Sequence, residues 1–152
     1  IGNGTGWRVG AMAGSPDFIG DIATIKGNTD SGFVAPMAAG ALCALLTDKK
    51  SIAEVVALYA RRSALLQAIL TKAGMLLAVE PKAGFFTLWK SPKRAFGREM
   101  KSAQDFNFAM IEKTGLVGVH FGPYIRYAVA HDDVEAVAGK IAVAFAKAKV
   151  SY

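Results

Sequence analysis

The fold class is decided by the stretch LVGVHFGPYIRYAVA (residues 116–130), in which two apolar runs flank the turn Gly122-Pro123. Runs rich in β-branched and aromatic residues on both sides of such a turn are typical of neighbouring strands. The pattern therefore predicts strands over Leu116–Phe121 and Tyr124–Ala130, and the second of these contains a lone cation, Arg126.

Two more strands are expected earlier, at Met75–Val79 and Gly84–Trp89. Ser102 followed by Asp105 is typical of a helix N-cap, and Asp132 is expected to open a last helix with apolar residues at helical spacing. The resulting order is strand, strand, helix, strand, strand, helix. This order predicts an α+β unit in which helices form a layer on a small sheet.

The first third of the chain favours helices. The small apolar run Trp7–Ala13 between glycines predicts a short buried strand. Ser15 and the Pro and Asp after it indicate the start of a helix that ends near Asn28. The stretch Asn28–Gly32 predicts a turn, and Phe33–Leu46 predicts an apolar helix enclosed by other elements.

A long helix is expected next, because Ser51 and Glu54 form a capping box and apolar residues then recur at helical spacing until Gly74. Its length suggests a helix that links parts of a larger assembly. The basic stretch Lys90–Lys101 predicts a solvated loop. Stacking aromatic residues are sparse there, so a nucleic-acid partner is not expected.

The composition favours one folded domain: of 152 residues, 53% are hydrophobic and 20% are charged. The single cysteine excludes an internal disulfide and fits a reducing, cytoplasmic compartment. No apolar run reaches the roughly 18 residues that a membrane span needs. Ile1 is not an initiator methionine, so the chain is expected to belong to a longer protein.

Common catalytic and ligand-binding motifs are missing. Gly2, Gly4 and Gly6 do not have the spacing of a dinucleotide-binding loop. His120 and His131 have no further ligands at metal-binding spacing, so no metal is predicted. Cys43, the lone cysteine, is expected to be a packed thiol within an apolar helix.

Arg8 and Arg126 are the candidate functional residues, because each is a lone cation in an apolar run predicted to be a strand. Charge is rarely buried without a partner. That partner could be a structural carboxylate of the chain, or the phosphate or carboxylate of a ligand, for which the planar guanidinium is well shaped. The residues alone leave both alternatives open.

Four motifs in order resemble those of the class I/II aminotransferases, pyridoxal-phosphate-dependent enzymes of fold type I. They are Gly6-Trp7-Arg8-Val9-Gly10, Lys26-x-Asn28-Thr29-Asp30-Ser31-Gly32, Gly84-Phe85-Phe86-x-Leu88-Trp89 and Tyr124-Ile125-Arg126-Tyr127-Ala128. The resemblance covers almost the whole chain. The Asn28–Gly32 stretch is most similar to that of the LL-diaminopimelate and aspartate-type aminotransferases. It departs from the family at His120, where many relatives have proline.

The resemblance implies that pyridoxal 5'-phosphate is the cofactor and that Arg8 binds its phosphate. Arg126 would bind the α-carboxylate of the amino-acid or 2-oxo-acid substrate. Asn28 and Ser31 would lie near a cofactor, in a turn that reaches across a homodimer boundary. The Schiff-base lysine of the family would lie just ahead of Ile1, and Lys26 could not replace it.

The resemblance also implies an α/β family fold, of which this chain is the end of the large cofactor-binding domain plus a small α+β domain. Its parts would be residues 1–46 of the large domain, an interdomain helix over 47–74, and the small domain over 75–152. The implied reaction is transamination. A C–S lyase, a decarboxylase or a synthase of the same fold, or the aminotransferase-like domain of a transcription regulator, would also keep both arginines.

Overall fold

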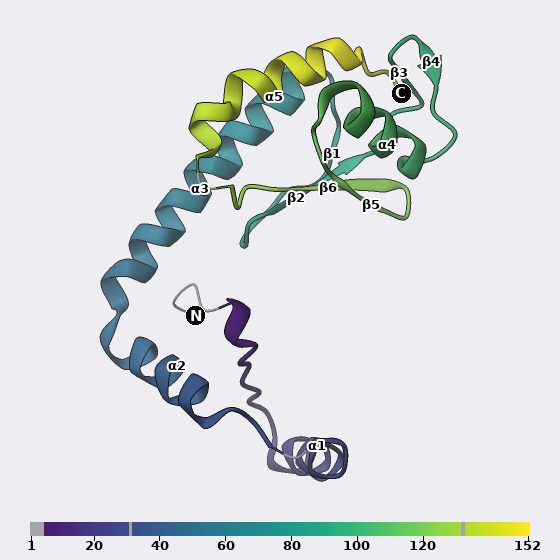
Figure 1. Cartoon of the computed structure of the whole chain (residues 1–152). Helices are drawn as coiled ribbons and strands as arrows, with labels where there is room; N and C mark the ends of the chain where they lie inside the picture. Colours follow the sequence, from purple (N-terminus) through teal and green to yellow (C-terminus); the bar gives the residue numbers. More distant parts are fainter. Residues whose placement is uncertain (1–4, 31, 132) are drawn as a thin grey trace. The chain divides into compact units, whose positions relative to one another are not determined.

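The computed structural model describes residues 5–30, 32–131 and 133–152, and the chain divides into two compact units (Figure 1). Unit 1 comprises Ile1–Val56 and unit 2 comprises Ala57–Tyr152. The predicted long helix is confirmed as α3, which continues from one unit into the other. The division at residues 46 and 74 stays a prediction.

Unit 1 contains only helical elements among its described residues. They are η1 (Thr5–Trp7), α1 (Pro16–Thr29), α2 (Ala35–Thr47) and the beginning of α3 (Lys49–Lys72).

Unit 2 contains the rest of α3, two further helices and six short strands. They are β1 (Leu77–Val79), β2 (Phe86–Lys90), β3 (Arg94–Ala95), β4 (Arg98–Glu99), α4 (Ala103–Thr114), β5 (Val119–Phe121), β6 (Tyr124–Ala128) and α5 (Val134–Ala148).

The four predicted strands are confirmed and form one antiparallel sheet in the order β1-β2-β6-β5. In this register Arg126 of β6 lies between Leu88 of β2 and Val119 of β5. Residues directly opposite each other in a ladder share a face of the sheet. The three side chains therefore lie on the same face.

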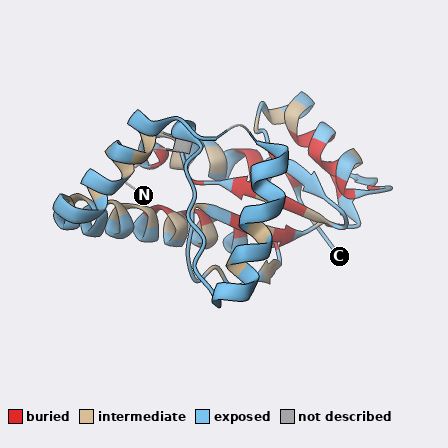
Figure 2. Ribbon diagram, turned by 90° about the horizontal axis from the view of Figure 1, so that it is seen from below, coloured by how far each residue is buried: buried red, intermediate tan, exposed pale blue. Residues whose placement is uncertain are grey.

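The core of unit 2 lies on the other face of this sheet. Figure 2 shows buried residues along the strands and the helices that pack on them, and Trp89, Phe106 and Phe145 are fully buried there. The indole of Trp89 donates a hydrogen bond to the hydroxyl of Thr87 at 2.8 Å, which satisfies its one polar group. The sheet is thus covered by helices on one face within unit 2.

The prediction of a loop over Lys90–Lys101 is wrong, because β3 and β4 form a hairpin there. Phe96 and Gly97 connect them, and both have positive φ, 52° and 76°. Two consecutive residues with positive φ are what a two-residue type I′ turn requires. Ala95 of β3 is fully buried, so the hairpin is part of the core rather than a solvated segment.

The predicted start and end of α4 are confirmed. The hydroxyl of Ser102 accepts a hydrogen bond from the backbone N–H of Asp105, and Gly115 ends the helix in the left-handed conformation. The last helix is also confirmed, with Asp133 accepting from the N–H of Ala136. Asp132, which was expected to open it, lies outside the described residues.

The predicted capping box of α3 is wrong. The helix begins at Lys49, and Ser51 lies inside its first turn. The carboxylate of Asp48 accepts hydrogen bonds from the N–H and hydroxyl of Ser51. An aspartate just before a helix satisfies a free N–H as well as serine does, so the cap lies three residues earlier than expected.

The predicted strand at Trp7–Ala13 is also wrong: a single 3-10 turn ends at Trp7 and no regular element follows before α1. A strand needs a neighbour for its backbone hydrogen bonds, and the described part of unit 1 contains no other strand. In α2, no residue is buried within the described chain, and Cys43 is exposed rather than packed. The apolar pattern predicted the helix but not its surroundings.

Candidate functional site

Arg126 lies in the central strand pair of unit 2, as predicted, and its side chain is half-buried. Its guanidinium carbon lies 4.2 Å from the centroid of the Phe86 ring. Phe86 is paired with Ala128, two residues along β6 from Arg126, so the aromatic ring reaches the guanidinium diagonally across the strands. This cation–π contact holds the guanidinium over the open face of the sheet.

The described part of the chain provides no counter-charge for Arg126. In residues 5–30, 32–131 and 133–152, no carboxylate lies within ion-pair distance of its guanidinium. The face around it is apolar and open, with Phe86, Val119 and Phe121 each more than two fifths exposed. A cation presented among apolar side chains attracts an anion more strongly than one surrounded by water.

Arg8 follows the 3-10 turn of unit 1 rather than lying in a strand. Its φ is 55°, in the left-handed region that residues other than glycine rarely adopt, and its side chain is exposed. The preceding Trp7 packs on α2, where a Cβ at Gly40 would lie 2.5 Å from the indole ring. Only glycine permits this close approach, which fixes the chain next to Arg8.

Arg8 likewise has no carboxylate partner within the part of the chain that the structure describes. Residues with unusual φ and an exposed functional group are frequent in ligand-binding loops. Arg8 can therefore accept an anionic group from outside the described chain.

Asn28 lies in the last turn of α1, and its amide donates a hydrogen bond to the Thr24 carbonyl at 2.8 Å. The predicted turn therefore begins later, because Asn28 and Thr29 are still helical. Lys26 pairs with Asp30, the residue that follows α1. Ser31, the other predicted cofactor-binding residue, lies outside the described residues.

The structure brings Arg126 together with Phe86 and Val119, and sequence reasoning did not single out Phe86. The signal was present in the run Gly84-Phe85-Phe86, but the register that places Phe86 near Arg126 is not visible in the sequence. Arg8 and Asn28 belong to unit 1 and Arg126 to unit 2, so each is described within its own unit.

The histidines and acidic residues form no metal centre in the described ranges, where no group of three or more such side chains converges. His120 lies on β5, exposed, with its ring 6.1 Å from that of Phe108. None of the described helices is both long and apolar enough to cross a membrane.

The family comparison matches residues 3–138 to the model "Aminotransferase class I and II". The chain belongs to this family. It is 34% identical over 138 residues to LL-diaminopimelate aminotransferase of Methanocaldococcus jannaschii and 31% identical over 115 residues to the enzyme of that name from Nitratidesulfovibrio vulgaris. These alignments cover 86% and 76% of this chain, and 32% and 28% of the two relatives.

Comparison with solved structures also identifies the aminotransferase fold. An aminotransferase from Staphylococcus aureus superposes with a TM-score of 0.77 at 21% sequence identity. The match covers 94% of this chain and 39% of the other. The chain thus has part of the aminotransferase fold and spans about a third of the length of the curated relatives it matches.

Proposed function

We propose that this chain contributes the two anion-binding arginines of a pyridoxal-phosphate-dependent aminotransferase, which transfers an amino group between an amino acid and a 2-oxo acid. LL-diaminopimelate is the first substrate to test, because relatives covering most of the chain carry that name. The observation that carries the proposal is the guanidinium of Arg126, held on Phe86 with no carboxylate partner in the described chain.

The residues present fit the proposed cofactor. A phosphate monoester needs cationic and N–H donors, and Arg8 offers an exposed guanidinium without a carboxylate partner among the described residues. Arg8 would hold the phosphate, and Asn28 and Ser31 would approach the cofactor bound by the partner chain, as the family resemblance implies. When bound, the cofactor supplies an electron sink and a carrier for the amino group.

Arg126 would bind the α-carboxylate of the substrate through two parallel N–H···O hydrogen bonds. The stack on Phe86 limits rotation of the guanidinium, so the carboxylate is held in one orientation. Val119 and Phe121 present exposed apolar side chains on the same face of the sheet as Arg126. A fixed carboxylate orients the other bonds of the substrate Cα, which is how positioning accelerates a reaction.

The test compares two substitutions in the full-length enzyme, Arg126→Lys and Arg8→Lys. Lysine keeps the charge but cannot form the two-pronged pair, which removes about 1.5–3 kcal/mol, or roughly 10- to 150-fold. For Arg126→Lys the loss should fall on kcat/KM for the amino acid, with cofactor affinity little changed. For Arg8→Lys the dissociation constant of the cofactor should rise, with turnover at saturating cofactor less affected.

Arg94→Lys is the matched control, because Arg94 is an exposed arginine of the β3–β4 hairpin. This substitution should change neither kcat/KM for the amino acid nor the dissociation constant of the cofactor. Wild-type kcat/KM in Arg126→Lys for every amino acid tried would contradict the assignment. Turnover must also depend on a 2-oxo acid. A product formed without one would favour a lyase or decarboxylase that uses the same arginines.

We also propose that the full-length enzyme is a homodimer in which the segment around Asn28 approaches the partner's cofactor. The family resemblance supports this arrangement. Sedimentation of active enzyme is the test, and activity in a species that sediments as a monomer would contradict it.

A further inference from the structure

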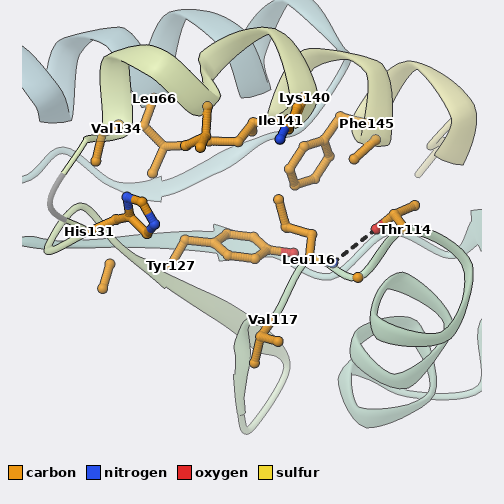
Figure 3. Close-up of a pocket in the computed structure, with 14 residues that line it drawn as sticks. Leu66, Thr114, Leu116, Val117, Tyr127, His131, Val134, Lys140, Ile141 and Phe145 are labelled. Carbon is orange, nitrogen blue, oxygen red and sulfur yellow. Dashed lines mark hydrogen bonds between the residues drawn. The ribbon is translucent and has the colours of Figure 1, made fainter.

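A pocket lies on the face of β6 opposite to Arg126 (Figure 3). Tyr127 follows Arg126 directly, and successive side chains of a strand point to opposite faces. The pocket has a volume of about 370 Å³ and is enclosed by α5, by Leu66 of α3, by β6 and by residues 114–117 at the end of α4. Every residue that lines it belongs to unit 2.

The walls of this pocket are mainly apolar. Leu66, Leu116, Val134, Ile141 and Phe145 line it together with the ring of Tyr127. A volume of this size with such a lining is typical of sites for one small organic molecule. The pocket is therefore suited to an apolar molecular body.

The hydroxyl of Tyr127 is buried and has no hydrogen-bond partner within the described residues. A buried hydroxyl without a partner costs free energy, and most such groups in folded proteins are satisfied. Burial also raises the pKa of Tyr127, so the hydroxyl keeps its proton and can donate it. Figure 3 shows this hydroxyl beside Leu116, a residue of the segment that closes the pocket.

Lys140 and His131 are further polar side chains of the pocket that can donate, whereas the Thr114 hydroxyl is engaged with the Met110 carbonyl and the Leu116 N–H. Lys140 lies on α5 toward the Phe145 end, and no carboxylate in the described chain lies within ion-pair distance of its ammonium. His131 lies at the other end, beside Val134. Its Nδ1 accepts the N–H of Asp133 at 3.0 Å, which in the neutral ring leaves the proton on Nε2.

Among the residues that the structure describes, no aspartate or glutamate lines the pocket. Two described acids at the start of α5 are engaged elsewhere: Asp133 caps the helix, and Glu135 pairs with Arg61 and Arg62. The described lining of the pocket thus combines apolar walls with hydrogen-bond donors and a cation, and it contains no carboxylate.

We propose that this pocket binds a small amphiphilic carboxylate, with its carboxylate at the Lys140 and Tyr127 end and its apolar body toward Leu66 and Val134. The carboxylate then supplies the acceptor that the Tyr127 hydroxyl lacks among the described residues. The site is separate from the substrate position at Arg126 and does not depend on the proposed function.

The test measures binding of 3-phenylpropionate to the full-length protein by calorimetry, with 3-phenylpropanol as the uncharged control of the same shape. The acid should bind saturably and at least about tenfold more tightly than the alcohol. Lys140→Gln should weaken binding of the acid about fivefold, since Lys140 is exposed. Tyr127→Phe should weaken it about tenfold.

Val137→Phe should abolish binding, because Val137 lines the pocket and a larger side chain there fills it. Val143→Phe is the matched control: Val143 lies on the same helix, is 68% exposed and is not part of the pocket. Circular dichroism verifies that each variant folds. If Val137→Phe fails to fold, the exposed Lys140→Gln decides the question.

Three results would overturn the proposal. One is the absence of saturable binding of the acid, and another is equal affinity for the acid and the alcohol. The third is loss of binding in Arg126→Lys, which would place the acid at the opposite face of the sheet. Binding that persists in Arg126→Lys and falls in Lys140→Gln supports the pocket.

Discussion

Asn107→Ala should be among the most damaging single substitutions in unit 2. Asn107 lies on α4 and is 4% exposed. Its amide donates to the carbonyl of Gly118 at 3.0 Å and its oxygen accepts the N–H of the same residue at 3.1 Å. This pair of hydrogen bonds fixes the start of β5, the strand that flanks Arg126.

The expected cost follows from these two contacts. Gly118 is buried, and a Cβ added there would lie only 2.7 Å from the Tyr127 ring, so water has little room to replace the lost amide. Each buried backbone group left without a partner costs about 1–3 kcal/mol. Asn107→Ala leaves two such groups without a partner and should therefore lower the free energy of unfolding by about 2–6 kcal/mol.

Urea unfolding monitored by circular dichroism measures this change, and hydrogen exchange of the Gly118 amide reports the local contact. Gln104→Ala is the control, because Gln104 is an exposed residue of the same helix. A loss below about 1 kcal/mol in Asn107→Ala, with Gly118 still protected from exchange, would refute the reasoning.

Two further predictions concern the same unit. Thr87→Val should lower the free energy of unfolding by about 1–3 kcal/mol, because the buried indole N–H of Trp89 loses its acceptor. In a Trp89→Phe background, Thr87→Val should lower the free energy of unfolding much less, because no indole N–H is left to satisfy. Thermal unfolding of the wild type, the two single variants and the double variant tests this. Arg98 lowers the pKa of Asp105 from its ordinary 3.8 to about 2. The carboxylate therefore stabilises the fold above pH 3.8 and loses this effect toward pH 2. In Asp105→Asn the free energy of unfolding should therefore change less with pH between pH 3.8 and pH 2 than in the wild type, as measured by urea unfolding at each pH.

Local sequence signals were sufficient where a helix or strand is specified by its own residues. Ser102, Asp105 and Gly115 identify both ends of α4, because capping is a contact between residues close in the chain. The Gly122-Pro123 turn likewise identifies the β5–β6 hairpin. These elements were predicted correctly because helix caps and tight turns depend on residues that are close together in the chain.

The errors arose where partners decide the conformation. The apolar run Trp7–Ala13 has strand composition, but the described part of unit 1 offers it no strand to pair with. In the basic stretch, charged residues suggested a loop, whereas the positive φ values of Phe96 and Gly97 form a tight hairpin. Phe96 gives no warning of this, because a turn with φ above zero normally uses glycine or asparagine.

The candidate site shows the same division between local and distant information. The apolar, aromatic-rich run after the Gly122-Pro123 turn placed Arg126 in a strand. A lone cation in such a run left two possible partners, a structural carboxylate or the anion of a ligand. The position of its guanidinium depends on Phe86, which is 40 residues away in sequence and comes close only through the β2–β6 register. A one-residue shift in that register would move Phe86 to the opposite face. The cation–π contact is therefore a property of the assembled sheet, and Phe86→Leu should raise KM for the amino acid while Arg126 remains in place.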